Sequence, residues 1–360
     1  MANVIDDDVV RNILGRLPGK PLLRCRRVSK HWNRLISDPY FMKTRSRRMV
    51  LLPFSRPLVV LDDNVPVKDK VFVIHSPSLQ LQERVVEQVS IVGTFNGVVL
   101  LALTVHNYLR CDLILYNPLT SASKKLVAMD VPASCNYQKP YVFGCVDDLK
   151  HIVRFELFSE VSRHNHSSMY TWDVFDLKTS LWSGQKRHLK RDFKFWDGVG
   201  IFLNGFLYWA IDHVMFGILA LNVKEMVFSR IKGPVQRNLV GPLLGSIDGC
   251  LCMVTTTHVA TFDFWVRKEE EGSWLKQRSF TIHLATCVKP FRPVCILGNG
   301  NILFTTRTML LVMYDTSKGT YEKLFHLINP NEFEPTSSVY LFKDIRSIEY
   351  VESLVSPFDT

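Results

Sequence analysis

Residues 203–231, "LNGFLYWAIDHVMFGILALNVKEMVFSRI", decide the fold of most of this chain. The Asn-Gly pair at their start favours a tight hairpin turn, and the aromatic and branched apolar runs that follow favour strands. The stretch 201–223 is also apolar enough to be weighed as a membrane span. Asp212 argues against that reading, because an aspartate at the centre of a bilayer costs about 2.5–3.5 kcal/mol. We therefore interpret the stretch as paired, buried strands.

The same pattern recurs along the chain at a step of about 45–50 residues, which is typical of propeller blades. In each unit a turn leads to an apolar strand, and a later strand ends in a pair such as Tyr116-Asn117 or Phe262-Asp263. Six such units begin near residues 49, 90, 137, 197, 240 and 290. The closing "SIEYVESL" is expected to return a strand to the first unit. Residues 49–360 are thus predicted to form an all-β β-propeller of about six blades, with a pair of β-sandwiches as the alternative; the resemblance described below implies that this propeller is kelch-like.

Residues 1–48 have a different, helical pattern. Apolar residues lie at helical spacing from Val9 to Leu17, behind Asp6 or Asp7 as a cap and before a break at Pro18-Gly19. A second short helix is expected to begin at Pro21, and a third after Ser29, with its end before Asp38-Pro39. The sequence therefore predicts an α+β multidomain chain, in which a small three-helix domain precedes the β body.

The positive charge of the chain is concentrated in this helical segment. The whole chain has a formal net charge of +10, and residues 1–48 hold 12 Lys and Arg against four Asp, a charge of +8. Three helices in so short a segment do not close a full core alone, so some apolar residues are left for another surface. That surface belongs either to the chain's own β body or to a partner. Its charge predicts an anionic partner.

Several classes of function find little support in the sequence. The eight cysteines have no C-x-x-C spacing, which favours free thiols in a reducing compartment over disulfides or a zinc site. No catalytic residue, metal or cofactor site is predicted, since the acidic residues are dispersed and no nucleophile motif occurs. The acidic start "MANVIDDD" is no signal peptide. We expect a protein of the cytoplasm and/or nucleus that does not associate with membranes.

Residues 7–41, "DDVVRNILGRLPGKPLLRCRRVSKHWNRLISDPYF", closely resemble the F-box of the large plant F-box family. The order and spacing of the marks match, from Val9-Val10 through Val28-Ser29-Lys30 to Asp38-Pro39. One place departs from the family pattern: Ile5 and Asp6 stand where a Leu-Pro pair is usual. The body resembles the F-box-associated interaction domain through segments such as "FNGVVLL", "LYNPLT", "FLNGFLYWAI" and "MYDTSKGTYEKL".

The resemblance implies a non-enzymatic substrate receptor of an SCF-type (cullin–RING) ubiquitin ligase. The F-box would bind a Skp-type adaptor, and through it the cullin and RING subunits, while the propeller holds an unidentified target protein for ubiquitination. Skp-type adaptors are acidic, which agrees with the +8 segment. Trp32, Leu35 and Ile36 would be divided between the module's core and this face. The adaptor contacts implied are Ile5, Val9, Ile13, Leu14, Leu17, Pro18, Leu22, Leu23, Val28, Lys30 and Trp32.

The alternative reading of the basic helices is a nucleic-acid-binding protein. It rests on charge alone, because large apolar residues interrupt the basic cluster and few Asn or Gln residues stand where a recognition helix would read bases. We therefore expect no nucleic-acid partner. The residues that bind the target are not identifiable from the sequence. The tryptophans of the body are expected to pack within blades, although one at a propeller mouth could contact a target; they are Trp172, Trp182, Trp196, Trp209, Trp265 and Trp274.

Overall fold

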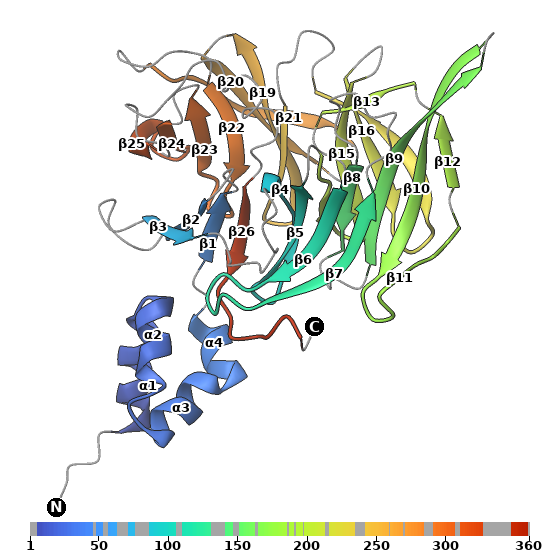
Figure 1. Cartoon of the computed structure of the whole chain (residues 1–360). Helices are drawn as coiled ribbons and strands as arrows, with labels where there is room; N and C mark the ends of the chain where they lie inside the picture. Colours follow the sequence, from blue (N-terminus) through green and yellow to red (C-terminus); the bar gives the residue numbers. More distant parts are fainter. Residues whose placement is uncertain are drawn as a thin grey trace, which may run out of the picture.

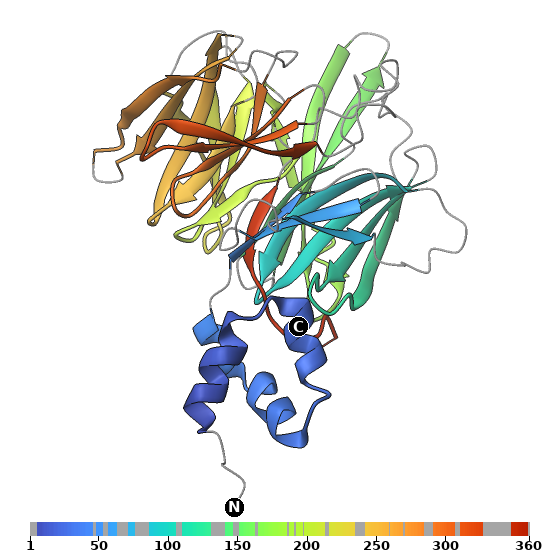
Figure 2. The same ribbon diagram turned by 90° about the vertical axis from the view of Figure 1, so that its left-hand side faces the viewer.

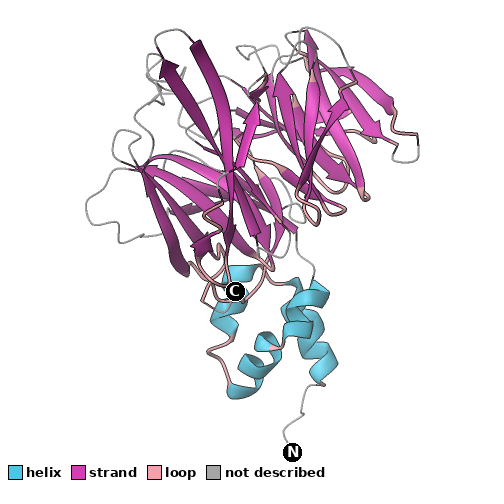
Figure 3. Cartoon of the chain, turned by 90° about the vertical axis from the view of Figure 1, so that its right-hand side faces the viewer, coloured by secondary structure: helices cyan, strands magenta, loops and turns pink. Residues whose placement is uncertain are grey.

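The computed structural model describes most of the chain between residues 6 and 358. The stretches that lie outside the described residues are 46–47, 53–56, 63–70, 76–85, 106–109, 131–140, 147–150, 163–164, 186, 191, 197, 213–215, 235–241, 259, 269–270, 284–290, 307–309, 327–346 and the chain ends. Within the described part, helices are confined to the N-terminal module, and strands form the remainder of the molecule (Figure 3).

Four helices make up the described N-terminal module, which projects from one face of the β body (Figure 1). The first begins behind Asp6, whose carboxylate accepts a hydrogen bond from the Asp8 N–H at 3.2 Å. The third begins behind Ser29, whose Oγ accepts from the Trp32 N–H at 3.1 Å. Both predicted caps are therefore confirmed. The helices are α1 (Asp7–Arg16), α2 (Gly19–Cys25), α3 (Lys30–Ser37) and α4 (Pro39–Arg45).

Two details of the helical module differ from the sequence prediction. The second helix begins at Gly19 rather than at Pro21, because a proline is tolerated anywhere in a first turn, where N–H groups lack helical partners. The third helix ends before Asp38-Pro39, as predicted, but a fourth helix that was not predicted begins at Pro39. Asp38 caps this new helix by accepting from the Tyr40 N–H at 3.0 Å, and Pro39 occupies its first position.

The described strands form six antiparallel sheets, which radiate around a common centre as the blades of a β-propeller (Figures 1 and 2). The strands of blades 1 to 3 have the following bounds. Blade 1 contains β1 (Arg48–Leu52), β2 (Pro57–Asp62), β3 (Val71–His75) and β26 (Ile348–Val351). Blade 2 contains β4 (Val86–Phe95), β5 (Val98–Val105), β6 (Arg110–Tyr116) and β7 (Ser123–Asp130). Blade 3 contains β8 (Tyr141–Cys145), β9 (His151–Ser162), β10 (Asn165–Asp176), β11 (Leu181–Trp182) and β12 (Arg187–Lys190).

Blades 4 to 6 repeat the same up-and-down arrangement. Blade 4 contains β13 (Lys194–Phe195), β14 (Ile201–Leu203), β15 (Phe206–Asp212), β16 (Gly217–Asn222) and β17 (Val227–Lys232). Blade 5 contains β18 (Leu243–Ile247), β19 (Cys250–His258), β20 (Thr261–Arg267) and β21 (Trp274–Thr281). Blade 6 contains β22 (Phe291–Ile296), β23 (Ile302–Thr306), β24 (Leu310–Asp315) and β25 (Thr320–His326).

The ring is closed by strands from the two ends of the β body. β26 pairs antiparallel with β1, with Met49 opposite Tyr350, so blade 1 contains both the first and the last strand (Figure 1). This confirms the predicted closing strand. Such closure ties the last part of the ring to the first blade.

The stretch 203–231 forms most of blade 4, as the strand interpretation predicts. Asn204 and Gly205 make the turn between β14 and β15, and Trp209 is fully buried in the blade. The Trp209 indole N–H donates to the Phe143 carbonyl of blade 3 at 2.9 Å, which links neighbouring blades. None of the helices in the described part of the chain is long and apolar enough to cross a membrane.

Candidate functional site

Two of the predicted adaptor contacts lie inside the helical module rather than on its surface. Leu14 is 1% exposed and Leu22 is fully buried. Both pack in one cluster with Leu35 and Ile36 of α3, which are also buried. Leu14 and Leu22 are thus covered within the chain itself, and their contact with the adaptor stays a prediction. They hold α1 and α2 in place, because each fills the space between the helices of this small core.

Other predicted residues lie in solvent. Val9 and Ile13 are 50% and 56% exposed and lie four residues apart on α1, so they share one face of that helix. Val10 and Leu14, the buried residues of the same helix, form its other face. Val28 is 64% exposed in the turn after α2. Together with Tyr40, which is 69% exposed, four large hydrophobic side chains of the described module therefore remain uncovered.

The remaining predicted residues lie between these extremes. Lys30 is exposed at the start of α3, and Ile5 lies outside the described residues. The others are partly buried, and these are Leu17, Pro18, Leu23 and Trp32. Leu17, Leu23 and Trp32 pack against the module's core. The structure thus separates a core group from an exposed group, and the role of the exposed group in adaptor binding stays a prediction.

The basic residues of the module are likewise divided. Most are exposed, and these are Arg16, Lys20, Arg24, Arg27, Lys30 and Arg34. Two polar contacts connect the helices: the Arg11 Nη1 lies 3.2 Å from the Asp38 carboxylate, and the His31 Nε2 lies 2.9 Å from the Asp7 carboxylate. On α1 itself, the exposed apolar residues follow the acidic first turn of Asp7 and Asp8 and precede Arg16, while the other exposed cations lie in 20–34.

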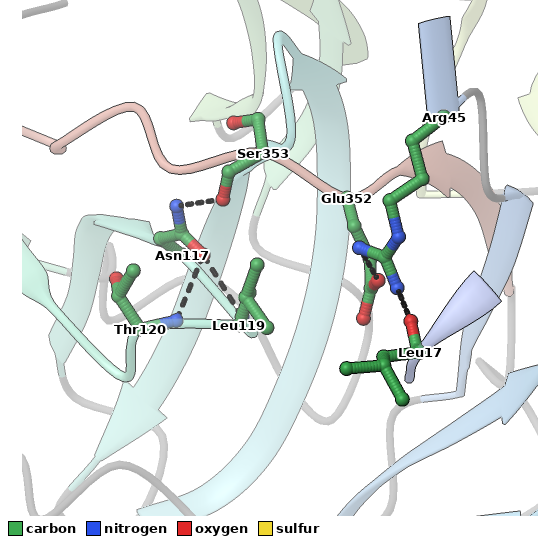
Figure 4. A network of polar contacts seen from close by, with 7 residues as sticks. All are labelled: Leu17, Arg45, Asn117, Leu119, Thr120, Glu352 and Ser353. Atoms are coloured by element: carbon green, nitrogen blue, oxygen red, sulfur yellow. Dashed lines mark hydrogen bonds and ion pairs between the residues drawn. The ribbon is translucent and has the colours of Figure 1, made fainter. Parts of the chain in front are cut away.

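Arg45, the last residue of α4, points inward instead. Its Nη1 lies 2.9 Å from Glu352 Oε2, and the two side chains are 1% and 7% exposed. Its Nη2 donates to the carbonyl oxygen of Leu17, at the end of α1. One guanidinium therefore connects two helices of the module with the chain segment that follows β26 (Figure 4).

Apolar contacts accompany this ion pair. Leu119 of blade 2 is 5% exposed and packs in the core cluster of the helical module, against which Leu354 also packs. Gly19, the first residue of α2, leaves no room for a side chain. A Cβ there would lie 2.4 Å from both Glu352 Oε1 and Leu119 Cδ1. The helical module therefore docks on its own β body, one of the two possibilities that the sequence left open.

Asn117 of blade 2 stabilises the same contact by binding the segment that follows β26. Its side chain is fully buried, and its Nδ2 donates to the carbonyl oxygens of Ser353 at 3.1 Å and Val355 at 2.7 Å. Its Oδ1 accepts from the N–H groups of Leu119 and Thr120, which shapes the turn that carries Leu119 (Figure 4). We call this contact, formed by Leu17, Gly19, Arg45, 117–120 and 352–355, the joint.

Sequence reasoning did not find the joint. Nothing local distinguishes Arg45 from its basic neighbours in the sequence. Asn117 follows the end of a predicted strand, but its bonds to Ser353 and Val355 span more than 230 residues of sequence. Such long-range contacts leave no mark in the periodicity of one chain.

The described residues contain no group of three or more His, Cys, Asp or Glu side chains arranged to hold a metal ion. Their cysteines are free, and these are Cys25, Cys111, Cys145, Cys250, Cys252 and Cys295. Burial raises the pKa of the Cys111 thiol to about 12, with a smaller contribution from neighbouring Asp112. This thiol is therefore protonated at neutral pH and is a packing group.

Comparisons with known proteins agree with this arrangement. Residues 5–44 match the model of the F-box domain, and residues 46–357 match the model of the F-box associated beta propeller domain. The chain is 27% identical over 351 residues to F-box protein CPR1 of Arabidopsis thaliana, covering 86% of this chain and 81% of that protein. It is 25% identical to the F-box/kelch-repeat protein At3g23880 of the same plant, covering 98% and 95% respectively.

Proposed function

The chain belongs to the family of F-box proteins with an F-box-associated β-propeller, and from this premise we propose that it is the target-recognition subunit of an SCF-type ubiquitin ligase. In this role the F-box binds a Skp-type adaptor, which connects it with the cullin and RING subunits. The propeller binds the protein to be ubiquitinated. The proposed place of action is the cytoplasm and/or nucleus.

The observation that carries the proposal is the exposed apolar face of α1. Val9 and Ile13 are half or more exposed although the module has a core of its own and a joint with the propeller. Their exposure supports a protein partner, because an apolar centre with a charged rim is the usual anatomy of a protein interface. The exposed Arg and Lys residues of the module favour an acidic partner, as Skp-type adaptors are.

The proposed receptor acts by proximity. It makes no covalent bond itself, but holds a target lysine near a ubiquitin-loaded conjugating enzyme at high effective concentration. Such a mechanism depends on the orientation of the propeller relative to the F-box, since a target held at the wrong distance gains little. The joint supports this requirement, because it fixes the two domains through buried polar and apolar contacts.

Co-purification of the full chain with a Skp-type adaptor tests the proposal. We expect the wild-type chain to co-elute with the adaptor, and the double variant Val9→Asp with Ile13→Asp to lose it, because two carboxylates would then face an acidic partner. A control is Leu275→Asp, which places one new carboxylate on an exposed apolar residue of blade 5.

Unchanged co-elution of the double variant would contradict the proposed role of α1. The nucleic-acid alternative would be favoured if the wild-type chain does not bind the adaptor but binds duplex DNA or RNA. The affinity for the nucleic acid should then fall steeply as the salt concentration rises.

A further inference from the structure

A groove lies between blades 3 and 4, away from the helical module. It encloses a cavity of about 690 Å³, bounded by the end of β10, by β11 and by the turns β14–β15 and β16–β17. Its walls are largely apolar, and the large apolar side chains that line it are Trp172, Trp182, Leu181, Phe202 and Met226. Trp172 and Trp182 are among the tryptophans expected to pack within blades, and here they also line an open groove.

The groove opens where the outer strand of blade 3 is interrupted. That strand consists of two pieces, β11 with two residues and β12 with four, whereas the outer strands of blades 2, 5 and 6 have eight, eight and seven residues. Gly184 lies in the interruption with a φ of 68° and with open space around its Cα. Beside it Leu181 is 66% exposed, a large apolar side chain at the rim without cover.

Two exposed cations, Arg187 and Lys224, line the groove together with the carboxylates of Asp173 and Asp176. Arg187 lies over the Trp172 ring at 5.1 Å, and neither Arg187 nor Lys224 makes an ion pair with a carboxylate in the part of the chain that the structure describes. Asp173, by contrast, accepts hydrogen bonds from the Ser183 hydroxyl and from the Val174 N–H.

Asp176 is also engaged. It accepts from the Thr179 N–H at 2.8 Å, and this bond holds the pKa of Asp176 below its ordinary value. His151 lies 3.9 Å from the same carboxylate. Asp173 is 4% exposed, so the exposed charged groups of the groove are two cations, Arg187 and Lys224, against the one carboxylate of Asp176. They lie beside an apolar wall that includes Trp172 and Trp182.

We propose that this groove binds an acidic segment of the target protein that carries a large apolar side chain. The apolar side chain would lie against Trp172 and Trp182, since such buried aromatic contacts provide most of the affinity of protein interfaces. The carboxylates of the segment would meet Arg187 and Lys224 at the rim. This inference rests on the proposed function, because it names the kind of target that the receptor recognises.

The position of the groove agrees with that role. In blade 2, the turns β4–β5 and β6–β7 contact the segment 353–355 at the joint. In blade 4, the corresponding turns, 204–205 and 223–226, line the groove. Equivalent turns of a propeller lie on the same face, so the bound segment would lie on the face that carries the F-box.

A peptide-display experiment on the purified full chain bound to a Skp-type adaptor tests the inference. Random peptides are selected on the complex, and the enriched sequences are synthesised and titrated. We expect the enriched peptides to combine acidic residues with a Trp, Phe or Leu. Their affinity should fall about tenfold with Arg187→Glu and with Leu181→Asp, because each removes one half of the recognition.

The control variants make the same changes on another blade. Arg278→Glu and Leu275→Asp alter exposed residues of β21 and should leave the affinity unchanged. The inference is overturned if the enriched peptides lack acidic residues, if the groove variants and the controls behave alike, or if no peptide is enriched over the Leu181→Asp complex. Failure of the proposed function is distinct, because then the complex with the adaptor does not form at all.

Discussion

The exposed face of α1 and the joint both involve the small helical module, but their side chains differ in burial. At the joint, Arg45 and Glu352 are almost fully buried, and Asn117 satisfies both of its amide groups with backbone partners. On α1, Val9 and Ile13 are left in solvent. The module therefore uses part of its surface for a contact within the chain and keeps another part for a second protein.

This difference shows how so small a module stays folded while keeping an apolar face open. Seven to ten residues per helix bury too little surface for a stable domain of this size. Leu119 and Leu354 add propeller side chains to the module's core, and the joint thereby supplies burial that the module lacks. Changes at the joint should consequently reduce stability, whereas changes on the exposed face of α1 should alter binding.

The largest effect is expected from breaking the buried ion pair. Arg45→Leu or Glu352→Leu alone should lower the free energy of unfolding by about 3–5 kcal/mol, since each leaves one buried charge without its partner. The double variant should lose less than the sum of the two. Urea unfolding followed by far-UV circular dichroism and tryptophan fluorescence measures this.

The exposed ion pair between Arg230 and Asp192 supplies the matched control. Both of its side chains are a third or more exposed, so Arg230→Leu should change the free energy of unfolding by no more than about 1 kcal/mol. Equal losses for Arg45→Leu and Arg230→Leu would mean that the joint contributes no more than a surface contact.

Two glycines of the module allow the joint to be compared with the exposed part of α1. Gly19→Ala should destabilise the protein by about 1–3 kcal/mol, because the new Cβ meets Glu352 and Leu119 at 2.4 Å and the joint must open. Gly15→Ala, in α1, should stabilise it by about 0.4–1 kcal/mol, since nothing lies within 4 Å of its Cβ position and alanine favours a helix. Thermal unfolding of both variants checks the opposite signs, and the same sign for both would contradict the close approach at Gly19.

An effect of similar size to that of Gly19→Ala is expected from the asparagine of the joint. Asn117→Ala should lower the free energy of unfolding by about 1–3 kcal/mol, because it leaves the partly buried carbonyls of Ser353 and Val355 without these donors. Asn222 makes the same kind of turn between β16 and β17, accepting from the N–H groups of Lys224 and Glu225, but its turn is exposed. Asn222→Ala should therefore change stability less, and equal losses would show that the turn alone explains the effect.

The sequence predicted the propeller because its signals are local. Each blade begins near a turn such as Asn204-Gly205, and strands with buried apolar runs follow at an even step, so the six blades and the closing β26 could be anticipated. The caps at Asp6 and Ser29 were predictable for the same reason, since a cap and the N–H that it binds lie two or three residues apart.

The features that escaped prediction depend on other parts of the chain. Leu14 and Leu22 resemble Val9 and Ile13 in sequence, and only the packing of the helices decides which pair is buried. Asp38-Pro39 fits both the end of one helix and the start of the next. The joint and the groove depend on which blades become neighbours, and that is a property of the closed ring.

The account assigns α1 to the adaptor and the joint to a contact within the chain. Hydrogen exchange of the full chain, free and bound to a Skp-type adaptor, tests this assignment most directly. The account predicts that the adaptor slows exchange in α1 (7–16) and in the turn 26–30, and leaves the joint segments 117–122 and 352–355 unchanged, because their partners are already within the chain. Slowed exchange at the joint with none in α1 would contradict it, since the adaptor would then bind the surface that the chain itself occupies.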